Sequence, residues 1–499
     1  MKNIIFKIEY RPTRLCDAAG YVKAMQVTLA SLFLIFVGLL APTFAENSGP
    51  EIPKKLSEAL SQYKIAQNDV TLLVQALDEV TPRVALNLDI DRNPASLIKL
   101  ITTWVALEVL GPNFTWETNL YAAKSAHRGN IVGNIILKGD GDPYFLNRDL
   151  WTLLGELKNS GISQITGDLL IDETKFLVDE TDPYLFDGDG RHIYNALPKS
   201  FVLNFNSIEL KFRVDQAGEM ILLTTKPSMP DLNLINNIDV IQKPCIGDMP
   251  KIKLSLVNDN EYLISGVMPT SCDEYKIYRD LIPHNLYVKN MFEKYWAQWG
   301  GTFSGSVGFG EVGTEHELLA SFKSRPLGEL VRVTNKWSNN LMARMLVYSL
   351  AGDIGEPPYT RSSGLKVITR ELRKNTLDTS NLVIDNGSGL SRDTKLTGRF
   401  LFQFLKTAWG KPYMPEFVSS MSIAGVDGTA RKRFQHPSQT GVMHLKTGSL
   451  EDVSAIAGYI HKKNGKTFVV FSIINSPNVN DGIGKKFESA LLDWTTDNL

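Results

Sequence analysis

The chain has 499 residues, and its 53 lysine and arginine residues almost balance its 54 aspartate and glutamate residues. A chain of this length exceeds what one hydrophobic core usually organises, so we expect more than one domain. The balanced charge and the 43% of hydrophobic residues are typical of a globular protein and exclude a strongly basic nucleic-acid binder.

The N-terminal segment has the layout of a secretory signal peptide. An uncharged apolar run, MQVTLASLFLIFVGLL, follows five basic residues and precedes small residues near Ala45. We therefore predict a signal peptide over residues 1–45, an exported, periplasmic protein and no stable membrane span after cleavage. The segment before the apolar run is long for such a signal, so either translation starts at Met25 or the leader stays as a membrane anchor.

Two of the three cysteines lie in the mature chain. Cys16 falls in the leader, whereas Cys245 and Cys272 follow it. In an oxidising compartment we expect these two to form a disulfide, with two unrelated buried thiols as the alternative. The cysteine spacing is not that of a metal site, and we predict neither a metal nor a cofactor.

The predicted elements divide the mature chain into a body and an insertion. Residues 51–66 have the pattern of an amphipathic helix, residues 70–88 that of strands, and residues 96–110 that of a helix closed by Gly111-Pro112. Residues 113–281 form short β-like runs broken by glycine, aspartate and proline. Helical patterns return at 326–351 and 362–373, before a hairpin around Asn464-Gly465 and a last helix over 484–497.

This order predicts an α/β (α+β) fold, in which an antiparallel sheet with flanking helices is interrupted by a mostly β region. We expect the body to comprise residues 46–112 and 285–499, and the inserted domain or domains to comprise residues 113–284.

The stretch Asn93-Pro-Ala-Ser-Leu-Ile-Lys99 places a serine and a lysine three residues apart at the start of an apolar helix. Side chains at this spacing share a helix face, so a neutral Lys99 could take the proton of Ser96. A lysine is neutral only when burial or a second cation lowers its pKa. The alternative is a helix-capping Ser96 beside a solvated Lys99, and the same Ser-x-x-Lys pattern begins at Ser61 and Ser363.

Two further short motifs lie downstream. Ser338-x-Asn340 precedes an apolar helix, and Lys446-Thr-Gly-Ser449 lies just before the C-terminal hairpin. A lysine beside a hydroxyl can hold a carboxylate, and a glycine lets a substrate backbone approach the strand. Taken alone, the first motif also fits a helix cap and the second a surface turn.

Together and in this order, the three motifs match the signature of penicillin-binding proteins and serine β-lactamases. Within that group the chain resembles the D-alanyl-D-alanine carboxypeptidase/endopeptidase family, the class C low-molecular-mass penicillin-binding proteins. The long interval between Ser96 and Ser338 is similar to that family. So are the stretches Gly139-Asp-Gly-Asp-Pro143, Asp385-Asn-Gly-Ser-Gly-Leu-Ser-Arg392, Ile423-Ala-Gly-Val-Asp-Gly-Thr429 and Lys446-Thr-Gly-Ser-Leu450.

The resemblance implies a serine D-Ala-D-Ala carboxypeptidase, also acting as an endopeptidase, in which the body is the catalytic domain. It implies peptidoglycan D-Ala-D-Ala peptides as substrates and β-lactam antibiotics as covalent inhibitors. Ser96 would be the nucleophile and Lys99 the general base. We expect the catalytic residues to be Ser96, Lys99, Ser338 and Asn340, and the substrate-binding residues to be Lys446, Thr447, Gly448, Ser449 and, on a weaker local match, Asp189.

Two other functions compete with this interpretation. A serine β-lactamase shares the three motifs, although the interval between its first two motifs is much shorter. A non-enzymatic cell-wall-binding protein could keep the fold, although we would then expect Ser96, Lys99 or Lys446 to be lost. Hydrolysis of a D-Ala-D-Ala peptide separates these classes.

Overall fold

The computed structural model describes residues 52–499, except 124–128, 132, 180–181, 248 and 437–438. The predicted signal peptide and Cys16 lie outside the described residues. None of the helices in the described part is long and apolar enough to cross a membrane.

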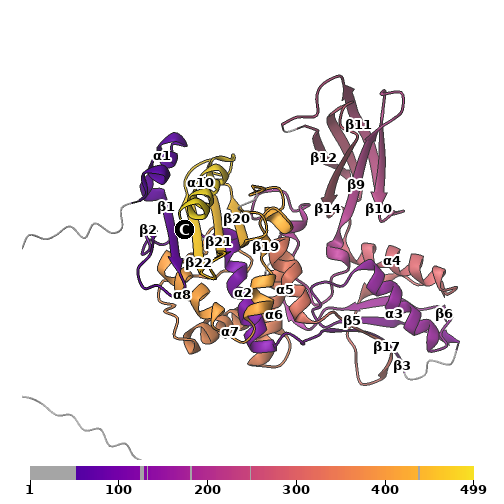
Figure 1. Cartoon of the computed structure of the whole chain (residues 1–499). Coiled ribbons are helices and arrows are strands. Elements are labelled where there is room, and N and C mark those ends of the chain that lie inside the picture. The colour runs from indigo at the N-terminus through magenta and orange to yellow at the C-terminus, as the bar shows by residue number, and fades with distance from the viewer. Residues whose placement is uncertain (1–51, 124–128, 132, 180–181, 248, 437–438) are drawn as a thin grey trace, which may run out of the picture. The chain divides into compact units, whose positions relative to one another are not determined.

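A six-stranded antiparallel sheet lies at the centre of the body (Figure 1). Its strands are β1 (Val70–Ala76), β2 (Val84–Leu86), β19 (Ser422–Ile423), β20 (Met443–Leu450), β21 (Val453–His461) and β22 (Thr467–Asn475). The order β19-β20-β21-β22-β1-β2 joins consecutive C-terminal strands to a strand from the other end of the described chain. The predicted hairpin is present as β21 and β22, with Gly465 of its turn in a left-handed conformation (φ 83°).

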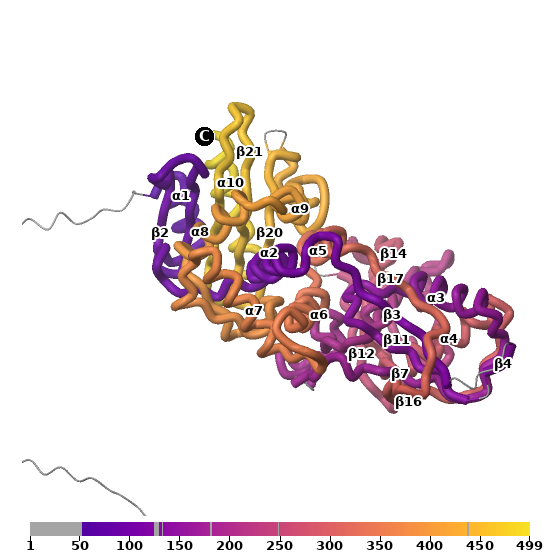
Figure 2. The backbone as a smooth tube through the Cα atoms, turned by 90° about the horizontal axis from the view of Figure 1, so that it is seen from below, coloured from indigo at the N-terminus to yellow at the C-terminus, as the bar shows by residue number. Residues whose placement is uncertain are grey.

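Helices cover both faces of this sheet, which confirms the predicted fold class. They are α1 (Lys54–Gln62), α2 (Ile98–Leu110), α5 (Leu327–Lys336), α6 (Asn340–Leu350), α7 (Arg361–Lys374), α8 (Gly398–Trp409), α9 (Met414–Ser419) and α10 (Ile483–Asn498). On one face, α10 packs against β21 and α1 packs against α10. On the other face, α8 packs against β1 and β22, and α2 contacts α5, α6 and α7 (Figures 1 and 2). Because both faces are covered, strands β1, β21 and β22 are buried along nearly their whole length and consist mostly of apolar residues.

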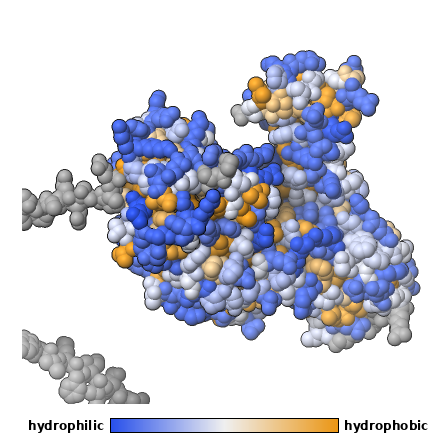
Figure 3. Space-filling model, viewed as in Figure 1, coloured by the Kyte–Doolittle hydropathy of each residue, from blue (hydrophilic) through white to orange (hydrophobic). Residues whose placement is uncertain are grey.

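The body therefore has two apolar cores, one on each side of the sheet. Alternate residues of a strand point to opposite faces, so Leu72 lies in one core and Leu73 in the other. Helix α2 is apolar on all sides because it runs through the middle of one core, buried from Ile98 to Leu107. The visible surface in Figure 3 is mostly hydrophilic, with apolar side chains in scattered groups.

The stretch 326–351, predicted as helical, is divided into α5 and α6 by a turn over residues 337–339. Ser338 has a left-handed backbone (φ 55°), which a continuous helix does not contain. Asn339 then caps α6, since its side-chain oxygen accepts a hydrogen bond from the Met342 N–H at 2.9 Å. Capping is thus done by Asn339, and Ser338 and Asn340 are left to make other contacts.

The described part of the inserted region contains one larger sheet, two α-helices, two three-stranded sheets and a third sheet of three short strands. The larger sheet has the order β16-β7-β5-β3-β17, formed by β3 (Glu117–Ala123), β5 (Ile135–Gly139), β7 (Leu169–Asp172), β16 (Val307–Phe309) and β17 (His316–Lys323). Helices α3 (Asn147–Asn159) and α4 (His284–Gln298) pack against each other. The smaller sheets are formed by β9 (Ile208–Val214), β10 (Ile221–Lys226) and β14 (Glu274–Arg279), and by β11 (Asn233–Ile241), β12 (Lys251–Asn258) and β13 (Glu261–Pro269).

Short strands complete this part of the chain. They are β4 (Asn130–Ile131), β6 (Gln164–Ile165) and β15 (Thr302–Phe303), which pair together, and β8 (Phe176–Leu177), which pairs with β18 (Tyr359–Thr360). Because β18 directly precedes α7, the β8–β18 pair joins the inserted region to the helices of the body.

The predicted border at residue 285 divides segments that the structure holds in one core. Strand β17 pairs with β3 and β16 pairs with β7, although β16 and β17 follow residue 285 in the chain. The buried apolar core of the inserted region accordingly extends from Leu120 to Ala320. Pairing between strands so far apart in sequence leaves no local pattern, and the order of the predicted elements therefore assigned β16 and β17 to the body.

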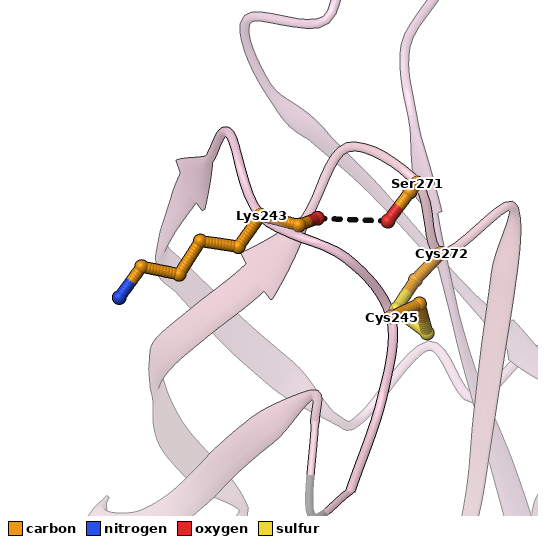
Figure 4. The surroundings of a disulfide bond; sticks show 4 residues. All are labelled: Lys243, Cys245, Ser271 and Cys272. Carbon is orange, nitrogen blue, oxygen red and sulfur yellow. Dashed lines mark hydrogen bonds between the residues drawn. A yellow bond between two sulfur atoms is a disulfide. The ribbon is translucent and has the colours of Figure 1, made fainter.

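The predicted disulfide is present between Cys245 and Cys272, whose Cα atoms are 5.2 Å apart (Figure 4). It closes a loop of 27 residues that contains β12 and β13. Beside it, the Ser271 hydroxyl donates a hydrogen bond of 2.8 Å to the Lys243 carbonyl. The disulfide therefore fastens one of the smaller sheets of the inserted region.

Candidate active site

Ser96 lies at the start of α2, in a short 3-10 turn formed by Ala95–Leu97. Two glycines approach this turn from different segments. A Cβ atom on Gly389 would overlap the Ala95 carbonyl, and one on Gly448 would lie 3.1 Å from the Ser96 nitrogen. Only glycine at these positions lets the 385–392 loop and strand β20 come so close to Ser96.

The Ser96 hydroxyl does not cap the helix. No side-chain hydrogen bond caps either the 3-10 turn or α2 in the described structure. Instead, Ser96 Oγ lies 2.9 Å from Lys99 Nζ. The geometry therefore favours the contact between the two side chains over the capping interpretation.

Lys99 is fully buried, with 0% of its surface exposed. Besides Ser96 Oγ, its amine contacts Asn340 Oδ1 at 2.6 Å and the Ser388 carbonyl. Burial lowers the pKa of Lys99 far below its ordinary value, and the nearby charges of Lys446 and Arg344 lower it further. The lowered pKa favours the neutral form of the amine, which is the form that accepts a proton.

Ser338 and Lys446 form a second pair of side chains. Ser338 Oγ lies 2.8 Å from Lys446 Nζ, which also donates to the Thr447 carbonyl at 2.6 Å. Burial lowers the pKa of Lys446 to about 7. The left-handed turn before α6 and the edge of strand β20 therefore bring a hydroxyl and a second amine together next to the Ser96–Lys99 pair.

The loop that precedes Thr429 is anchored beside β20. Lys336 Nζ lies 2.6 Å from Asp427 Oδ2 and donates to the Met421 carbonyl at 2.9 Å. At the end of the loop, the hydroxyl of Thr429 lies 2.8 Å from that of Thr447. Thr429 belongs to a stretch that carries the family resemblance, but sequence reasoning assigned no role to it.

The Ser388 carbonyl reaches Lys99 because its loop has a fixed shape. The Asn386 side-chain oxygen accepts hydrogen bonds from the Ser388 N–H at 3.0 Å and from the Ser388 hydroxyl at 2.9 Å. Gly387 and Gly389 have left-handed backbones (φ 72° and 80°). This loop also carries the resemblance, yet a carbonyl contact has no residue signature, so sequence reasoning missed it.

The inserted region reaches the site through backbone carbonyls. Asn340 Nδ2 donates to the Tyr194 carbonyl at 3.1 Å, and Arg344 Nη1 donates to the Ala196 carbonyl at 2.8 Å. A cavity of about 390 Å³ lies beside these contacts. Its lining includes Asp182, Asn195, Arg344, Asp385, Asn386 and Arg392.

Asp189 is occupied by a different contact. Its Oδ1 lies 2.7 Å from Arg191 Nε, and its Oδ2 lies 3.6 Å from His192 Nε2. The acidic side chains found on the wall of the cavity include Asp182 and Asp385. The predicted substrate contact of Asp189 stays a prediction.

The described residues contain no group of three or more histidine, cysteine, aspartate and glutamate side chains placed to hold a metal ion. The chemistry available at this site is that of a buried amine next to a hydroxyl, with a second amine and hydroxyl opposite. Such an arrangement can remove a proton from a serine and stabilise an acyl transfer.

A protein-family model described as "D-Ala-D-Ala carboxypeptidase 3 (S13) family" matches residues 52–498. A D-alanyl-D-alanine carboxypeptidase of an Actinomadura species is 29% identical over 492 residues, covering 93% of this chain and 89% of that protein. The D-alanyl-D-alanine carboxypeptidase DacB of Haemophilus influenzae is 25% identical over 473 residues, covering 94% of this chain and 96% of that protein.

The fold is also similar to a solved structure. The crystal structure of penicillin binding protein 4 (dacB) from Haemophilus influenzae superposes with a TM-score of 0.73 at 22% identity, covering 88% of this chain and 99% of that one. A second structure of that protein, complexed with a β-lactam, superposes with a TM-score of 0.69 at 22% identity and covers 89% of this chain and 99% of that one.

Proposed function

The chain belongs to the D-Ala-D-Ala carboxypeptidase 3 (S13) family of serine peptidases, and on that basis we propose that it cleaves peptidoglycan D-Ala-D-Ala peptides through an acyl-enzyme on Ser96. The observation that carries the proposal is the 2.9 Å contact between Ser96 Oγ and Lys99 Nζ, made by a fully buried amine. A serine hydroxyl needs such a base to become a nucleophile.

In the acylation step, Ser96 Oγ attacks the carbonyl carbon of the penultimate D-alanine and gives its proton to the neutral Lys99 amine. The new C–O bond replaces the C–N bond, and the proton passes through the Ser338 hydroxyl to the departing nitrogen. D-alanine leaves as an amine. Water then attacks the ester: its oxygen joins the carbonyl carbon, one of its protons goes to Ser96 Oγ, and the shortened peptide leaves with a free carboxyl group.

Two backbone N–H groups would hold the oxygen on which negative charge develops. Ser96 lies at the start of α2, and strand β20 brings Gly448, the residue before Ser449, close to the Ser96 nitrogen. Such donors are worth roughly 3 to 4 kcal/mol each in the transition state. Because they belong to the backbone, replacing the Ser449 side chain should leave the donor in place.

The terminal carboxylate of the substrate would bind Lys446 and Thr447. A carboxylate would stabilise the charged form of the buried Lys446 amine through a charge-assisted hydrogen bond. The Thr447 hydroxyl lies on the same strand, β20. Asn340 would orient Lys99 and the acyl side of the peptide. The 390 Å³ cavity beside Asn386 would receive the residues that precede the D-alanines.

We also propose that the protein cleaves cross-linked peptides, that it binds β-lactams and that it is exported to the periplasm. A cross-link presents the same D-alanine carbonyl with a different departing amine, so one site can serve as an endopeptidase. A β-lactam presents a reactive amide beside a carboxylate, and the solved relative that holds a β-lactam supports binding. The leader-like segment before residue 46 supports export to the periplasm, with loose membrane association or anchoring if the leader is kept.

The test is hydrolysis by the purified protein of a diacylated L-Lys-D-Ala-D-Ala peptide, followed as D-alanine release, beside benzylpenicillin. Release of D-alanine together with stable acylation by the drug supports the proposal. Rapid destruction of the drug without D-alanine release would identify a β-lactamase. If the protein neither cleaves the peptide nor reacts with benzylpenicillin, the result would favour a non-enzymatic cell-wall-binding protein.

The pH dependence of this reaction follows from the two buried amines. Lys99 acts when neutral, so kcat/KM rises as pH passes its lowered pKa, whereas Lys446 acts when charged and loses its proton above its pKa of about 7. Loss of the Lys446 charge also removes a cation that keeps Lys99 neutral. We therefore expect kcat/KM for D-alanine release to fall above about pH 7 in a pH profile.

Lys446→Arg provides the control for this profile. A guanidinium stays protonated throughout this pH range. The remaining kcat/KM of Lys446→Arg should therefore not fall above neutral pH. A parent profile that keeps rising through pH 8 would show that charge on Lys446 is not required.

Gly389→Ala should slow acylation of Ser96, although Gly389 belongs to none of the three motifs. The new Cβ would overlap the Ala95 carbonyl at a left-handed position, at a cost of about 1 to 3 kcal/mol, and the loop would move away from Lys99. We expect acylation by benzylpenicillin to slow at least about tenfold. Gly355→Ala is the matched control, because Gly355 has no neighbour within 4 Å. A parent-like rate in Gly389→Ala would contradict a positioning role for the loop.

A further inference from the structure

An exposed tryptophan borders the proposed active site. Trp337 ends α5 and directly precedes Ser338, and 57% of its surface is exposed. Exposing a large aromatic side chain forgoes the free energy that burial would provide. An aromatic ring exposed directly beside a residue of the proposed active site is placed where it can contact a ligand.

Arg431 accompanies this tryptophan. Its guanidinium lies over the Trp337 ring, 5.9 Å from the ring centre. Arg431 is exposed, and it forms no ion pair with another described residue. Its charge is therefore available to an anionic partner at the same place as the apolar ring.

Both residues lie next to the groups that would bind the departing part of the substrate. Trp337 directly precedes Ser338, whose hydroxyl contacts Lys446. Arg431 lies two residues after Thr429, whose hydroxyl contacts that of Thr447. The proposed function assigns Asn340 to the acyl side of the reacting bond, and Lys446 and Thr447 to the leaving-group side. Trp337 and Arg431 thus flank the leaving-group side.

We propose that Trp337 and Arg431 form a leaving-group subsite for the acceptor strand of a peptidoglycan cross-link. This inference rests on the proposed function and assigns endopeptidase activity to a defined surface. In a cross-link whose acceptor is a diaminopimelate-type residue, the departing amine lies next to a carboxylate, as it does in D-alanine, and Lys446 and Thr447 would hold both carboxylates alike. The two leaving groups differ in the side chain, which is a methyl group in D-alanine and a longer aliphatic chain in the acceptor residue.

That longer chain fits the surface beyond Thr447. Its methylene groups would lie on the Trp337 ring, and the acidic peptide attached at its far end would face Arg431. The bonds formed and broken are those of the acylation step above, with the acceptor amine leaving in place of D-alanine. The subsite therefore acts on substrate choice without changing the chemistry.

The test compares kcat/KM for a purified cross-linked muropeptide dimer with kcat/KM for the D-alanine-releasing tripeptide. We expect Trp337→Ala to lower the dimer-to-tripeptide ratio about tenfold, mainly through KM of the dimer, since hydrophobic side-chain contacts carry about this discrimination. Trp337→Phe should restore most of the ratio. Arg431→Ala should lower the ratio at low salt and much less at high salt, as expected for an exposed charge.

Phe309→Ala is the matched control. Phe309 is 58% exposed and has Lys199 over its ring at 5.9 Å, but it lies on β16 of the inserted region. Its removal should leave the ratio at the parent value. A ratio that Trp337→Ala does not change, or an equal loss on both substrates, would overturn the inference. A parent protein that cleaves neither substrate would instead refute the proposed function.

Discussion

After incubation with benzylpenicillin, the parent protein is expected to gain the mass of one drug molecule and to keep it, whereas Ser96→Ala gains none. Ser96 Oγ is the hydroxyl that contacts the buried Lys99 amine, and alanine removes the only atom that can form the ester. Intact-protein mass spectrometry measures both results. D-alanine release by Ser96→Ala should fall by at least about a thousandfold, as for loss of the nucleophile in other serine hydrolases.

Ser61→Ala is the control for this experiment. Ser61 begins the same Ser-x-x-Lys pattern, but it lies on the exposed part of α1, where its hydroxyl donates to the Ser57 carbonyl. The Ser61→Ala variant should therefore be acylated like the parent. An adduct on Ser96→Ala would place the nucleophile elsewhere and would contradict the proposed mechanism.

The sequence identified the side chains of the site better than their surroundings. Ser96 and Lys99 are one helical turn apart, so local spacing predicts their contact, and the order of the three motifs added Ser338, Asn340 and Lys446. The structure brings all five together. The proximity of these side chains was therefore predictable from local spacing and from the order of the motifs, whereas their catalytic roles stay predictions.

Contacts made by the backbone were not predictable. Ser388 is 289 residues from Lys99 in sequence and contacts it through a carbonyl, which every residue type possesses. The Tyr194 carbonyl reaches Asn340 from the inserted region in the same way. No residue pattern marks such contacts, and only the fold brings the segments together.

The fold shows the same limit. The hairpin of β21 and β22 and the helices at 96–110 and 362–373 follow local periodicity, and they were predicted within a few residues. The assignment of β16 and β17 depended on pairing with β7 and β3 across more than a hundred residues. The break between α5 and α6 depended on which of three consecutive polar residues caps the helix, and Asn339 does so.

Lys99→Met should remove nearly all acylation and yet leave the protein folded. Methionine matches the unbranched shape of lysine in a core position, so α2 can keep its packing, but it cannot accept the Ser96 proton. We expect the second-order rate of acylation by benzylpenicillin to fall by about a hundredfold to ten-thousandfold, the usual contribution of a general base. Lys366→Met, in the exposed Ser-x-x-Lys sequence on α7, should acylate like the parent.

The stability of Lys99→Met separates a base from a structural lysine. The substitution leaves Asn340 Oδ1 and the Ser388 carbonyl without this donor, at a cost of about 1 to 3 kcal/mol for each group. It also removes an amine whose burial disfavours its charged form, which offsets part of that cost. A thermal midpoint within a few degrees of the parent, measured together with the lost acylation, assigns Lys99 to proton transfer. Parent-like acylation in a folded Lys99→Met variant would show that another group removes the Ser96 proton.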